Sequence, residues 1–444
     1  MTQRKSPSRP VAVDLFSGAG GLSLGLEQAG FDVLAAVEYD PVHAATHKFN
    51  FPHTEVVPLS VAELSGSDLL EAASRGAVAH GRTFDELDLI AGGPPCQGFS
   101  WIGKRRVDDA RNDLIFHFWR LVHESRPKYF IMENVPGMKS GAHSDLLEDL
   151  VGKLRADGYR VAIPEILLAS GFGVPQARRR LFLIGSREDQ VQASLPSPHY
   201  FPSSMSDPKG SLALPAPTVW DAIGNLPDLD AFEDLLDSDE VALDPELVAA
   251  MQASASTYAR VMMGLQRDKD DFSWRRKFDA TLLTSSARTV HTELSRTRFA
   301  ATKPGSVEKV SRFLRLDPDG LCNTLRAGTG SEHGAHTSPR PIHPQSPRVI
   351  SVREAARLHS MPDWFRLHRT KWHGFRQVGN AVPPLLARAV ARSVVTSLGA
   401  APTKPRGVLQ LGDPMLLSLT MAESREFFEL EGNQGPAQRT RGAA

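Results

Sequence analysis

The first 187 residues alternate short apolar runs with longer amphipathic segments, and this alternation limits the folds open to the chain. Apolar runs flanked by amphipathic helices are typical of buried, mostly parallel strands. The predicted strands cover residues 11–16, 31–40, 87–93, 128–135 and 178–187. Segments with helical periodicity follow the first four strands, at residues 22–30, 41–50, 112–125 and 144–158. The alternation therefore predicts an α/β fold with a doubly wound, mostly parallel sheet.

The alternation stops at about residue 195, where a segment rich in proline and serine begins. Such a composition indicates a linker or an irregular loop. Helical periodicity returns at residues 351–361 and 383–398. We therefore expect a second, smaller and irregular domain, and a last helix that returns to the first domain. The predicted parts are a basic N-terminal extension (1–10), the α/β domain (11–190), the second domain with its linker (191–345), closing helices (346–400) and a C-terminal extension with a disordered end (401–444).

Composition excludes several classes of protein. No run of eighteen apolar residues occurs, so no membrane span is expected, and the basic start lacks the apolar core of a signal peptide. Cys96 and Cys322 are the two cysteines of the chain, which predicts neither a disulfide framework nor a metal cluster. We interpret Cys322 as a buried apolar side chain in a reducing cytosol.

Charge is balanced over the whole chain but unevenly placed. Lys and Arg number 51, as do Asp and Glu, so the formal net charge is zero. Residues 228–246 are acidic without a Lys or Arg, whereas residues 260–315 are rich in both. This segregation permits a face that binds a polyanion, and a merely solvated surface is the alternative.

A glycine turn joins the first predicted strand to the first helix, in "DLFSGAGGLSLGLEQAG" at residues 14–30. At such a turn the backbone can approach an adenosine-type cofactor closely. Glu38 lies twenty residues after Gly18, at the end of the next strand, where a carboxylate can accept both ribose hydroxyls. The spacing is not G-x-G-x-x-G, which argues against a nicotinamide dinucleotide. A purely structural turn remains the alternative.

The segment "GGPPCQGFS" places Cys96 just beyond a strand, where open α/β sheets carry out their chemistry. The thiolate is the nucleophilic form of cysteine, and electropositive neighbours lower the pKa of the thiol. A buried, inert cysteine is the alternative. Two prolines hold the backbone before Cys96, however, and a Pro-Pro turn rarely serves to bury a small side chain.

Two further motifs place charged side chains near strand ends. Glu133 in "IMENVPGM" would share the carboxyl edge of the sheet with Cys96, although it could also cap the following turn. In "QARRRLFLIG" the period of a strand sends Gln176, Arg178 and Arg180 to one face. Two arginines on one face of a strand require a carboxylate, a phosphate or a base edge as partner.

Six blocks in this order resemble the motifs of the DNA (cytosine-5) methyltransferase family, of restriction-modification or orphan type. They are "DLFSGAGGLSLGLEQAG", "GGPPCQGFS", "ENV", "QARRRLFLIG", "REAARLHSMPD" and "QVGNAVPP". The resemblance covers about residues 11–187 and 348–395. It implies a Rossmann-like methyltransferase sheet, with the family's variable target recognition domain in the segment between.

The resemblance implies S-adenosyl-L-methionine as cofactor and a cytosine flipped out of double-stranded DNA as methyl acceptor. Cys96 would attack carbon 6, Glu133 would assist at N3, and Arg180, supported by Arg178, would contact O2. The implied cofactor residues are Phe16, Gly18, Gly20, Gly21, Leu22, Glu38, Tyr39, Ser60, Pro94, Asn380, Ala381 and Val382. The implied DNA contacts are Gln97, Ser100, Lys104, Arg105 and Arg106. No metal is implied.

The sequence departs from the family pattern at two positions. Ser60 stands where an Asp usually contacts the adenine amino group, so Ser60 makes a weaker contact or Asp85 or Asp88 replaces it. His359 stands where the family more often has Gln, and we interpret it as structural.

Other activities fit the sequence less well than DNA methylation does. The tRNA-methylating branch shares the catalytic blocks but differs after the Gln of "PPCQGFS" and lacks so long a variable segment. A non-catalytic DNA-binding homologue is disfavoured because every expected catalytic residue is present, and amino-methylating enzymes because no Asp/Asn-Pro-Pro-aromatic motif occurs. We expect a cytoplasmic, nucleoid-associated monomer whose functional partner is a cognate restriction endonuclease.

Overall fold

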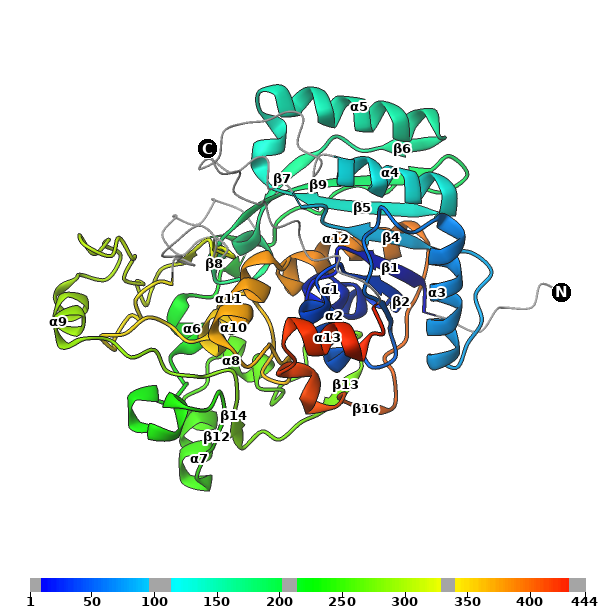
Figure 1. Cartoon of the computed structure of the whole chain (residues 1–444). Coiled ribbons are helices and arrows are strands. Elements are labelled where there is room, and N and C mark those ends of the chain that lie inside the picture. Colours follow the sequence, from blue (N-terminus) through cyan, green and yellow to red (C-terminus); the bar gives the residue numbers. More distant parts are fainter. Residues whose placement is uncertain (1–8, 96–112, 202–213, 329–339, 431–444) are drawn as a thin grey trace, which may run out of the picture.

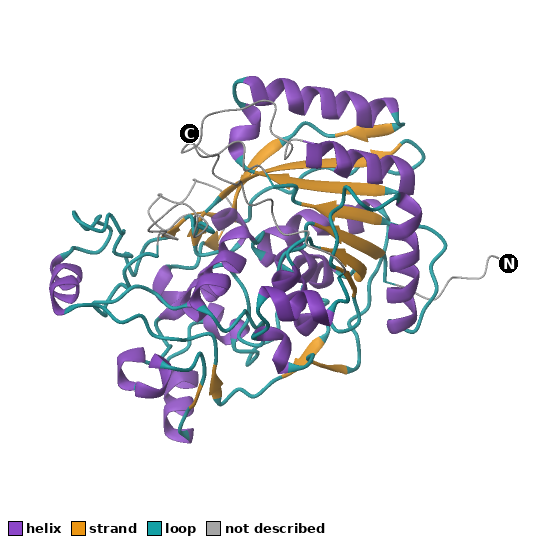
Figure 2. Cartoon of the chain, viewed as in Figure 1, coloured by secondary structure: helices purple, strands orange, loops and turns teal. Residues whose placement is uncertain are grey.

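A computed structural model of the chain describes residues 9–95, 113–201, 214–328 and 340–430. Its largest element is an eight-stranded sheet with the order β3-β2-β1-β4-β5-β9-β6, in which β7 also pairs with β9. Figure 2 shows this sheet as one twisted layer. Its strands are β1 (Val11–Leu15), β2 (Asp32–Val37), β3 (Glu55–Val57), β4 (Leu89–Gly92), β5 (Tyr129–Asn134), β6 (Tyr159–Val161), β7 (Glu165–Leu168) and β9 (Arg179–Arg187).

The sheet is mixed rather than mostly parallel. The pairs from β3 to β5 are parallel, whereas β9 runs antiparallel to β5, β6 and β7. All five predicted strands exist, and the predicted α/β fold with a doubly wound sheet is confirmed. The remaining strands of this sheet, β3, β6 and β7, are short and carry no pattern that predicts them.

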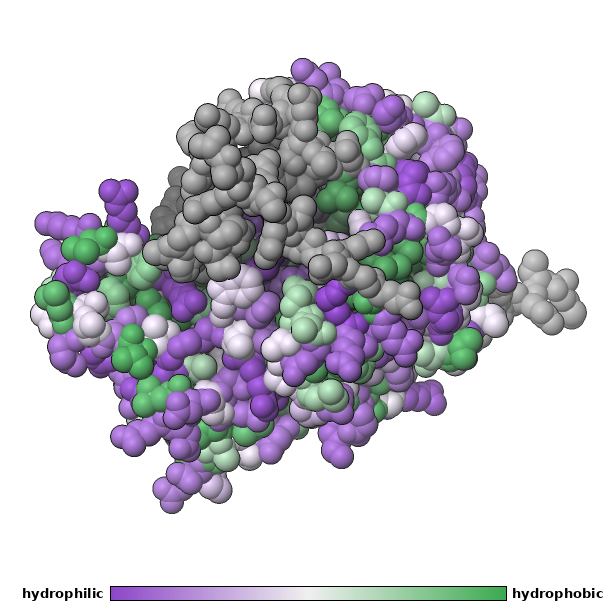
Figure 3. Space-filling model, viewed as in Figure 1, coloured by the Kyte–Doolittle hydropathy of each residue, from purple (hydrophilic) through white to green (hydrophobic). Residues whose placement is uncertain are grey.

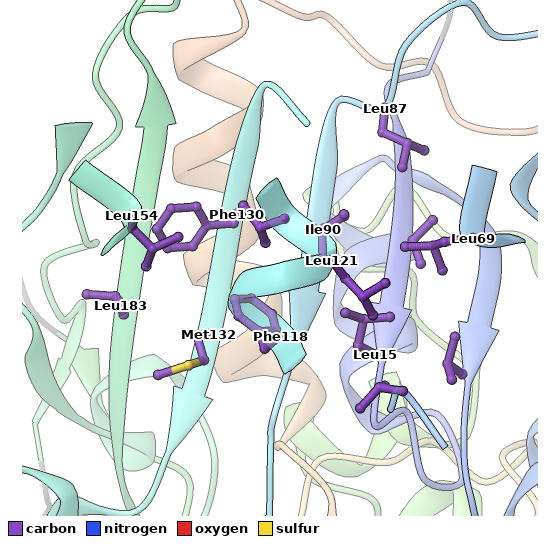
Figure 4. Packing of buried hydrophobic residues seen from close by; sticks show 14 of the residues in the cluster. Leu15, Leu69, Leu87, Ile90, Phe118, Leu121, Phe130, Met132, Leu154 and Leu183 are labelled. Carbon is purple, nitrogen blue, oxygen red and sulfur yellow. The ribbon is translucent and has the colours of Figure 1, made fainter. Parts of the chain in front are cut away.

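Helices cover both faces of the sheet. On one face α3, α4 and α5 pack through Leu69, Phe118 and Leu154 onto side chains such as Ile90 and Phe130. Figure 4 shows Phe118 and Leu121 lying over the strands in this layer. On the other face α1 and α12 bury a hydrophobic cluster against the sheet. These helices are α1 (Gly21–Ala29), α3 (Gly66–Ala79), α4 (Asp113–Ser125), α5 (Ala142–Ala156) and α12 (Pro384–Ser397).

The chain between the sheet and the closing helices forms short elements beside the sheet, at the lower left of Figure 1. One of its strands, β15 (Cys322–Asn323), pairs with β8 (Gln176–Ala177), which directly precedes β9. The other elements are β10 (Tyr200–Phe201), β11 (Leu214–Pro215), α6 (Val219–Ile223), β12 (Val241–Ala242), α7 (Pro245–Ala253), α8 (Thr257–Met262), β13 (Arg275–Lys277), β14 (Leu282–Leu283) and α9 (Glu293–Ala301). Cys322 is fully buried, as expected.

Much of the predicted acidic and basic segregation is neutralised inside the molecule. Arg288 and Arg296 both pair with Asp230, at 3.1 and 2.8 Å. The Arg276 side chain is fully buried and forms a two-pronged ion pair with Glu27 of α1, with distances of 2.6 and 2.8 Å. Part of the basic stretch therefore forms ion pairs within the protein and does not belong to an exposed basic face.

Both extensions make contacts with the rest of the chain. Arg9, predicted as part of an extension, is buried and donates to Asp32 and to four backbone carbonyls, including Thr403. After α10 (Val352–Leu358) and α11 (Lys371–Asn380), the C-terminal residues form β16 (Val408–Gln410) and α13 (Met421–Phe427). Leu416 and Leu417 pack onto Phe49 of α2 (Pro41–Asn50), and β16 pairs with β13. The predicted disordered end lies outside the described residues. Within the described ranges, no helix has the length and apolar character needed to cross a membrane.

Candidate active site

The carboxyl edge of the parallel strands gathers most of the predicted site residues that the structure describes. Phe16 follows β1, Glu38 follows β2, Gly93 follows β4, and Glu133 is the next-to-last residue of β5. Parallel strands end at a common edge, so residues far apart in the sequence become neighbours there.

The glycine turn between β1 and α1 is left-handed at three positions. Phe16, Gly18 and Gly20 have φ angles of 60°, 54° and 102°. A β-carbon at Gly20 would lie 2.3 Å from the ring of Phe51, so only glycine fits there. At Gly18 a β-carbon would have no atom of the described residues within 4 Å. The turn therefore leaves room beside the start of α1. The first N–H groups of a helix have no partner within the helix, so they can bind an anion there.

A buried carboxyl group lies under this turn. Asp14 of β1 accepts a 2.6 Å hydrogen bond from the Ser23 hydroxyl, while its other oxygen has no partner within the described part of the chain. Burial raises the pKa of Asp14 to about 7, against the effect of Ser23. An unpaired polar atom inside a protein is costly and usually awaits a partner. Asp14 was not among the predicted site residues, although it is a charged residue within an apolar strand.

Glu38 lies beside the same turn. Its two carboxylate oxygens accept hydrogen bonds of 2.8 Å from the N–H groups of Gly18 and Asp40. Burial, together with the nearby charge of Asp40, raises the pKa of Glu38 to about 7. Each oxygen retains a lone pair, so Glu38 can still accept a hydrogen bond from a hydroxyl group. Tyr39, the next residue, has a side chain that is 46 % exposed.

The segment after α11 lies directly against the start of α1. A β-carbon at Gly21 would lie 2.7 Å from the carbonyl oxygen of Val382 and 2.8 Å from the β-carbon of Ala381. Val382 and Leu22 belong to one buried cluster, whereas Asn380 is exposed. Residues 380–382 and 20–22 are thus neighbours in space, although they lie far apart in the sequence.

Ser60 and Asp88, one of its two suggested substitutes, lie at different edges of the sheet. Ser60 follows β3 at the carboxyl edge, and its hydroxyl accepts from the N–H of Ala62. Asp88 precedes β4 at the opposite edge, where it binds the N–H of Val11 and the Lys128 ammonium at 2.8 and 2.7 Å. Asp88 is therefore a poor substitute for Ser60, because β4 lies between it and the carboxyl edge of the sheet. A role for Asp85 stays a prediction.

Glu133 and Arg180 form an ion pair at the carboxyl end of β5. Antiparallel pairing sets Glu133 opposite Phe182, and Arg180 is two residues from Phe182 on the same face. The Nε of Arg180 lies 2.7 Å from Oε1 of Glu133, and both side chains are largely buried. Burial raises the pKa of Glu133, while the charges of Arg180 and Arg178 oppose the rise.

The backbone that leads to Cys96 is tied to the same strand end. A β-carbon at Gly93 would lie 2.9 Å from Oε2 of Glu133, and the Asn134 amide donates to the carbonyl of Pro94 at 3.3 Å. The site prediction omitted Asn134, although it follows Glu133 directly in "ENV". Cys96, Gln97, Ser100, Lys104, Arg105 and Arg106 lie outside the described residues.

Arg178 shares a face with Arg180 but faces the protein interior. Burial alternates as predicted, since Gln176 and Arg178 are buried while Ala177 and Arg179 are exposed. The Arg178 guanidinium donates to three carbonyls, those of Leu325, Gly379 and Ala381, at 2.8 to 3.0 Å. It is only 1 % exposed, so it holds the surrounding backbone and presents no free face.

The glycine turn, the Glu38 carboxyl group and the buried pair of Glu133 and Arg180 thus share one edge of the sheet. This arrangement is typical of α/β enzymes that bind an adenosine-bearing cofactor. A family model described as "C-5 cytosine-specific DNA methylase" matches residues 11–396 of the chain. The chain belongs to this family and is a DNA (cytosine-5)-methyltransferase, which methylates carbon 5 of cytosine in DNA.

The relatives agree with this assignment. The chain is 50 % identical over 422 residues to the type II methyltransferase M.XorII of Xanthomonas oryzae pv. oryzae, covering 95 % of this chain and 93 % of the relative. It is 33 % identical to M1.HphI of Haemophilus parahaemolyticus, covering 86 % of both chains. A crystal structure from E. coli, assigned as a prophage-encoded DNA modification methyltransferase, has a TM-score of 0.68 and 32 % identity over 88 % of this chain and 99 % of its own.

Proposed function

We propose that the chain transfers the methyl group of S-adenosyl-L-methionine to a cytosine flipped out of a specific duplex sequence, through a covalent bond between Cys96 and carbon 6. The observation that carries this proposal is the ion pair of Glu133 and Arg180, at 2.7 Å. The pair lies against Gly93, three residues before Cys96. A carboxyl group whose pKa is raised by burial and a cation therefore lie beside the strand end from which the nucleophile follows.

The residues around the glycine turn fit the cofactor. Glu38 would accept hydrogen bonds from the ribose hydroxyls, and Phe16 and Ser60 would contact the adenine. The unpaired oxygen of Asp14 would accept a hydrogen bond from the ammonium of the methionine part, and the first N–H groups of α1 would bind its carboxylate. Residues 380–382, Tyr39 and Pro94 complete the walls. When bound, S-adenosyl-L-methionine supplies an electrophilic methyl group on a positively charged sulfur.

The protein's own residues make the cytosine ring reactive. The Cys96 thiolate forms an Sγ–C6 bond while Glu133 gives a proton to N3, which leaves carbon 5 as an enamine carbon. Arg180 stabilises the charge that develops on O2. After methylation, loss of the carbon 5 proton to a base breaks the Sγ–C6 bond, and N3 returns its proton to Glu133. Arg178 acts as a positioning residue, because Nη1 and Nη2 of its buried guanidinium donate to backbone carbonyls.

Residues 191–345 act as the target recognition domain. Figure 1 shows α9 at the far edge of the molecule, and Figure 3 shows hydrophobic residues on that lobe. Its exposed apolar side chains are Val290, Leu294, Val307 and Val310, and its exposed basic ones are Lys303, Lys309 and Arg312. Basic side chains suit phosphates and apolar ones suit base edges. Gln97, Ser100, Lys104, Arg105 and Arg106 add DNA contacts near the reacting base.

The cellular setting follows from the substrate and from the relatives. Several relatives are type II methyltransferases, so a cognate restriction endonuclease is the functional partner. The enzyme acts as a monomer on the nucleoid in the cytoplasm, where its DNA is.

Bisulfite sequencing of DNA from a host that lacks cytosine methylation tests the proposal. Expression of the wild-type chain should protect the cytosines of one short sequence from bisulfite conversion. Cys96→Ser, at an equal protein level, should protect none. Methylation by Cys96→Ser, or protection of RNA rather than DNA, would contradict it.

A further inference from the structure

His359 is a fully buried histidine whose ring bonds to two distant segments of the chain. It follows α10, and its Nδ1 lies 3.1 Å from the amide nitrogen of Gln176 in β8. Its Nε2 lies 2.9 Å from the carbonyl oxygen of Ala381, in the turn between α11 and α12. Gln176 in turn accepts from the N–H of Leu325, next to β15.

The hydrogen-bond partners fix the form of the imidazole. The Oε1 of Gln176 accepts from Leu325, so its nitrogen is the donor, and Nδ1 of His359 must accept from it. The Ala381 carbonyl can only accept, so Nε2 must carry the proton. His359 is therefore the neutral Nε2–H tautomer with both ring nitrogens satisfied. A phenylalanine would fill the same space but would leave the amide donor of Gln176 with one acceptor fewer.

The Ala381 carbonyl joins His359 to the catalytic strand. The same oxygen accepts from Nη2 of Arg178 at 3.0 Å, and Arg178 is two residues from Arg180, the partner of Glu133. On its other side Ala381 lies against Gly21, at the start of α1. One carbonyl thus links the proposed cofactor pocket to the strand that carries the Glu133–Arg180 pair.

We propose that His359 is a positioning residue for methyl transfer, which fixes the turn at residues 380–382 against Arg178 and so sets the cofactor pocket relative to the cytosine pocket. The inference rests on the proposed function above. It deepens the earlier interpretation of His359 as structural, because the ring controls geometry at the site and not folding alone.

Three substitutions separate hydrogen bonding from packing. His359→Phe keeps the ring but removes both bonds, and His359→Asn retains only the acceptor near Gln176. His359→Gln retains a donor that reaches the Ala381 carbonyl. His343→Phe is a matched control, because His343 is also buried, but its Nδ1 accepts from Gln345 and Ser346 and its Nε2 lies 3.6 Å from Glu354, with no bond to the turn at residues 380–382 among the described residues.

Calorimetric titration with S-adenosyl-L-methionine, at a temperature where each variant is folded, measures the effect without turnover. Loss of the Ala381 bond should weaken cofactor binding about tenfold in His359→Phe and His359→Asn, and kcat should fall as well. His359→Gln should bind within about threefold of wild type. His343→Phe should lower the melting temperature but leave the cofactor Kd unchanged.

Cofactor binding and kcat at wild-type level in His359→Asn would overturn the positioning role, whatever the melting temperature. If His359→Phe does not fold, the comparison of His359→Asn with His359→Gln decides the matter. A wild-type chain that binds no S-adenosyl-L-methionine would instead refute the proposed function itself, so the two failures are distinguishable.

Discussion

Glu133 and Arg180 lie on neighbouring antiparallel strands and meet through an ion pair of 2.7 Å, almost shielded from solvent. Burial raises the pKa of the carboxyl group, while the guanidinium opposes that rise and orients one of its oxygens. The other oxygen, Oε2, faces Gly93, where a side chain would intrude. The pair therefore leaves one carboxyl oxygen directed at the space beside the strand that leads to Cys96.

Replacement of Glu133 tests its role as proton donor. Glu133→Gln keeps the shape of the side chain but cannot give a proton to N3, so methyl transfer should fall by about 10² to 10⁴. Cofactor binding should change little, because Glu133 does not line the glycine turn. Transfer of a tritiated methyl group to DNA measures the first quantity and calorimetry the second. Turnover within a few-fold of wild type would remove Glu133 from the mechanism.

The pKa of Glu38 predicts a pH dependence of ribose binding. The group ionises at about pH 7 in the folded chain rather than near its ordinary value of 4.5, and the ionised form accepts hydroxyls best. Affinity for adenosine, which lacks the ionisable methionine part, should therefore rise from pH 6 to pH 8. Glu38→Gln should bind weakly and without this rise.

The same shift affects stability without a ligand. Because the folded-state pKa is raised, the stabilising contribution of Glu38 is complete below pH 4.5 and is lost as the pH rises through about 7. The stability difference between wild type and Glu38→Gln, from urea unfolding at several pH values, should therefore move against the wild type over this interval. A constant difference would show that Glu38 titrates normally.

The close packing of α12 against α1 can be tested by adding one methyl group at Gly25. A β-carbon at Gly25 would lie 2.3 Å from the β-carbon of Ala387 and 2.8 Å from the carbonyl oxygen of Pro384. Gly25→Ala should lower the free energy of unfolding by about 1–3 kcal/mol. Gly152→Ala, in the exposed middle of α5 with open space around it, should raise it by about 0.5–1 kcal/mol. Equal effects in urea unfolding would contradict this packing.

The buried Arg276–Glu27 pair joins β13 to α1. Arg276→Met leaves the carboxylate of Glu27 without its partner, so the free energy of unfolding should fall by about 3–5 kcal/mol. Arg275→Ala changes the exposed neighbour and should stay within about 0.5 kcal/mol of wild type. Similar melting temperatures for both variants would show that the ion pair contributes little.

Local pattern predicted the elements whose residues carry strong periodicity. The buried strands β1, β2, β4, β5 and β9 and the amphipathic α4, α5 and α12 were all anticipated. Strand direction was not, because the pattern of β9 is the same whether it runs parallel or antiparallel to β5. That direction is what brings Arg180 to Glu133.

Long-range polar contacts were beyond the reach of the sequence. From the sequence, Arg9 and Arg276 are expected to be surface charges, because no residue nearby in the chain indicates their buried carboxylate partners, Asp32 and Glu27. Leu416 and Leu417 cover Phe49 although their segment lacks a clear period. Arg178 could be placed on the right face, but its three carbonyl partners come from residues more than 140 positions away.

The covalent step is tested most directly with duplex DNA that carries 5-fluorocytosine at the methylated position, incubated with the enzyme and S-adenosyl-L-methionine. Fluorine cannot leave as a proton does, so the protein should remain bound to the DNA under denaturing electrophoresis, and peptide mass spectrometry should place the bond at Cys96. Methyl transfer to ordinary cytosine with no trapped complex, or a bond at another residue, would contradict the account.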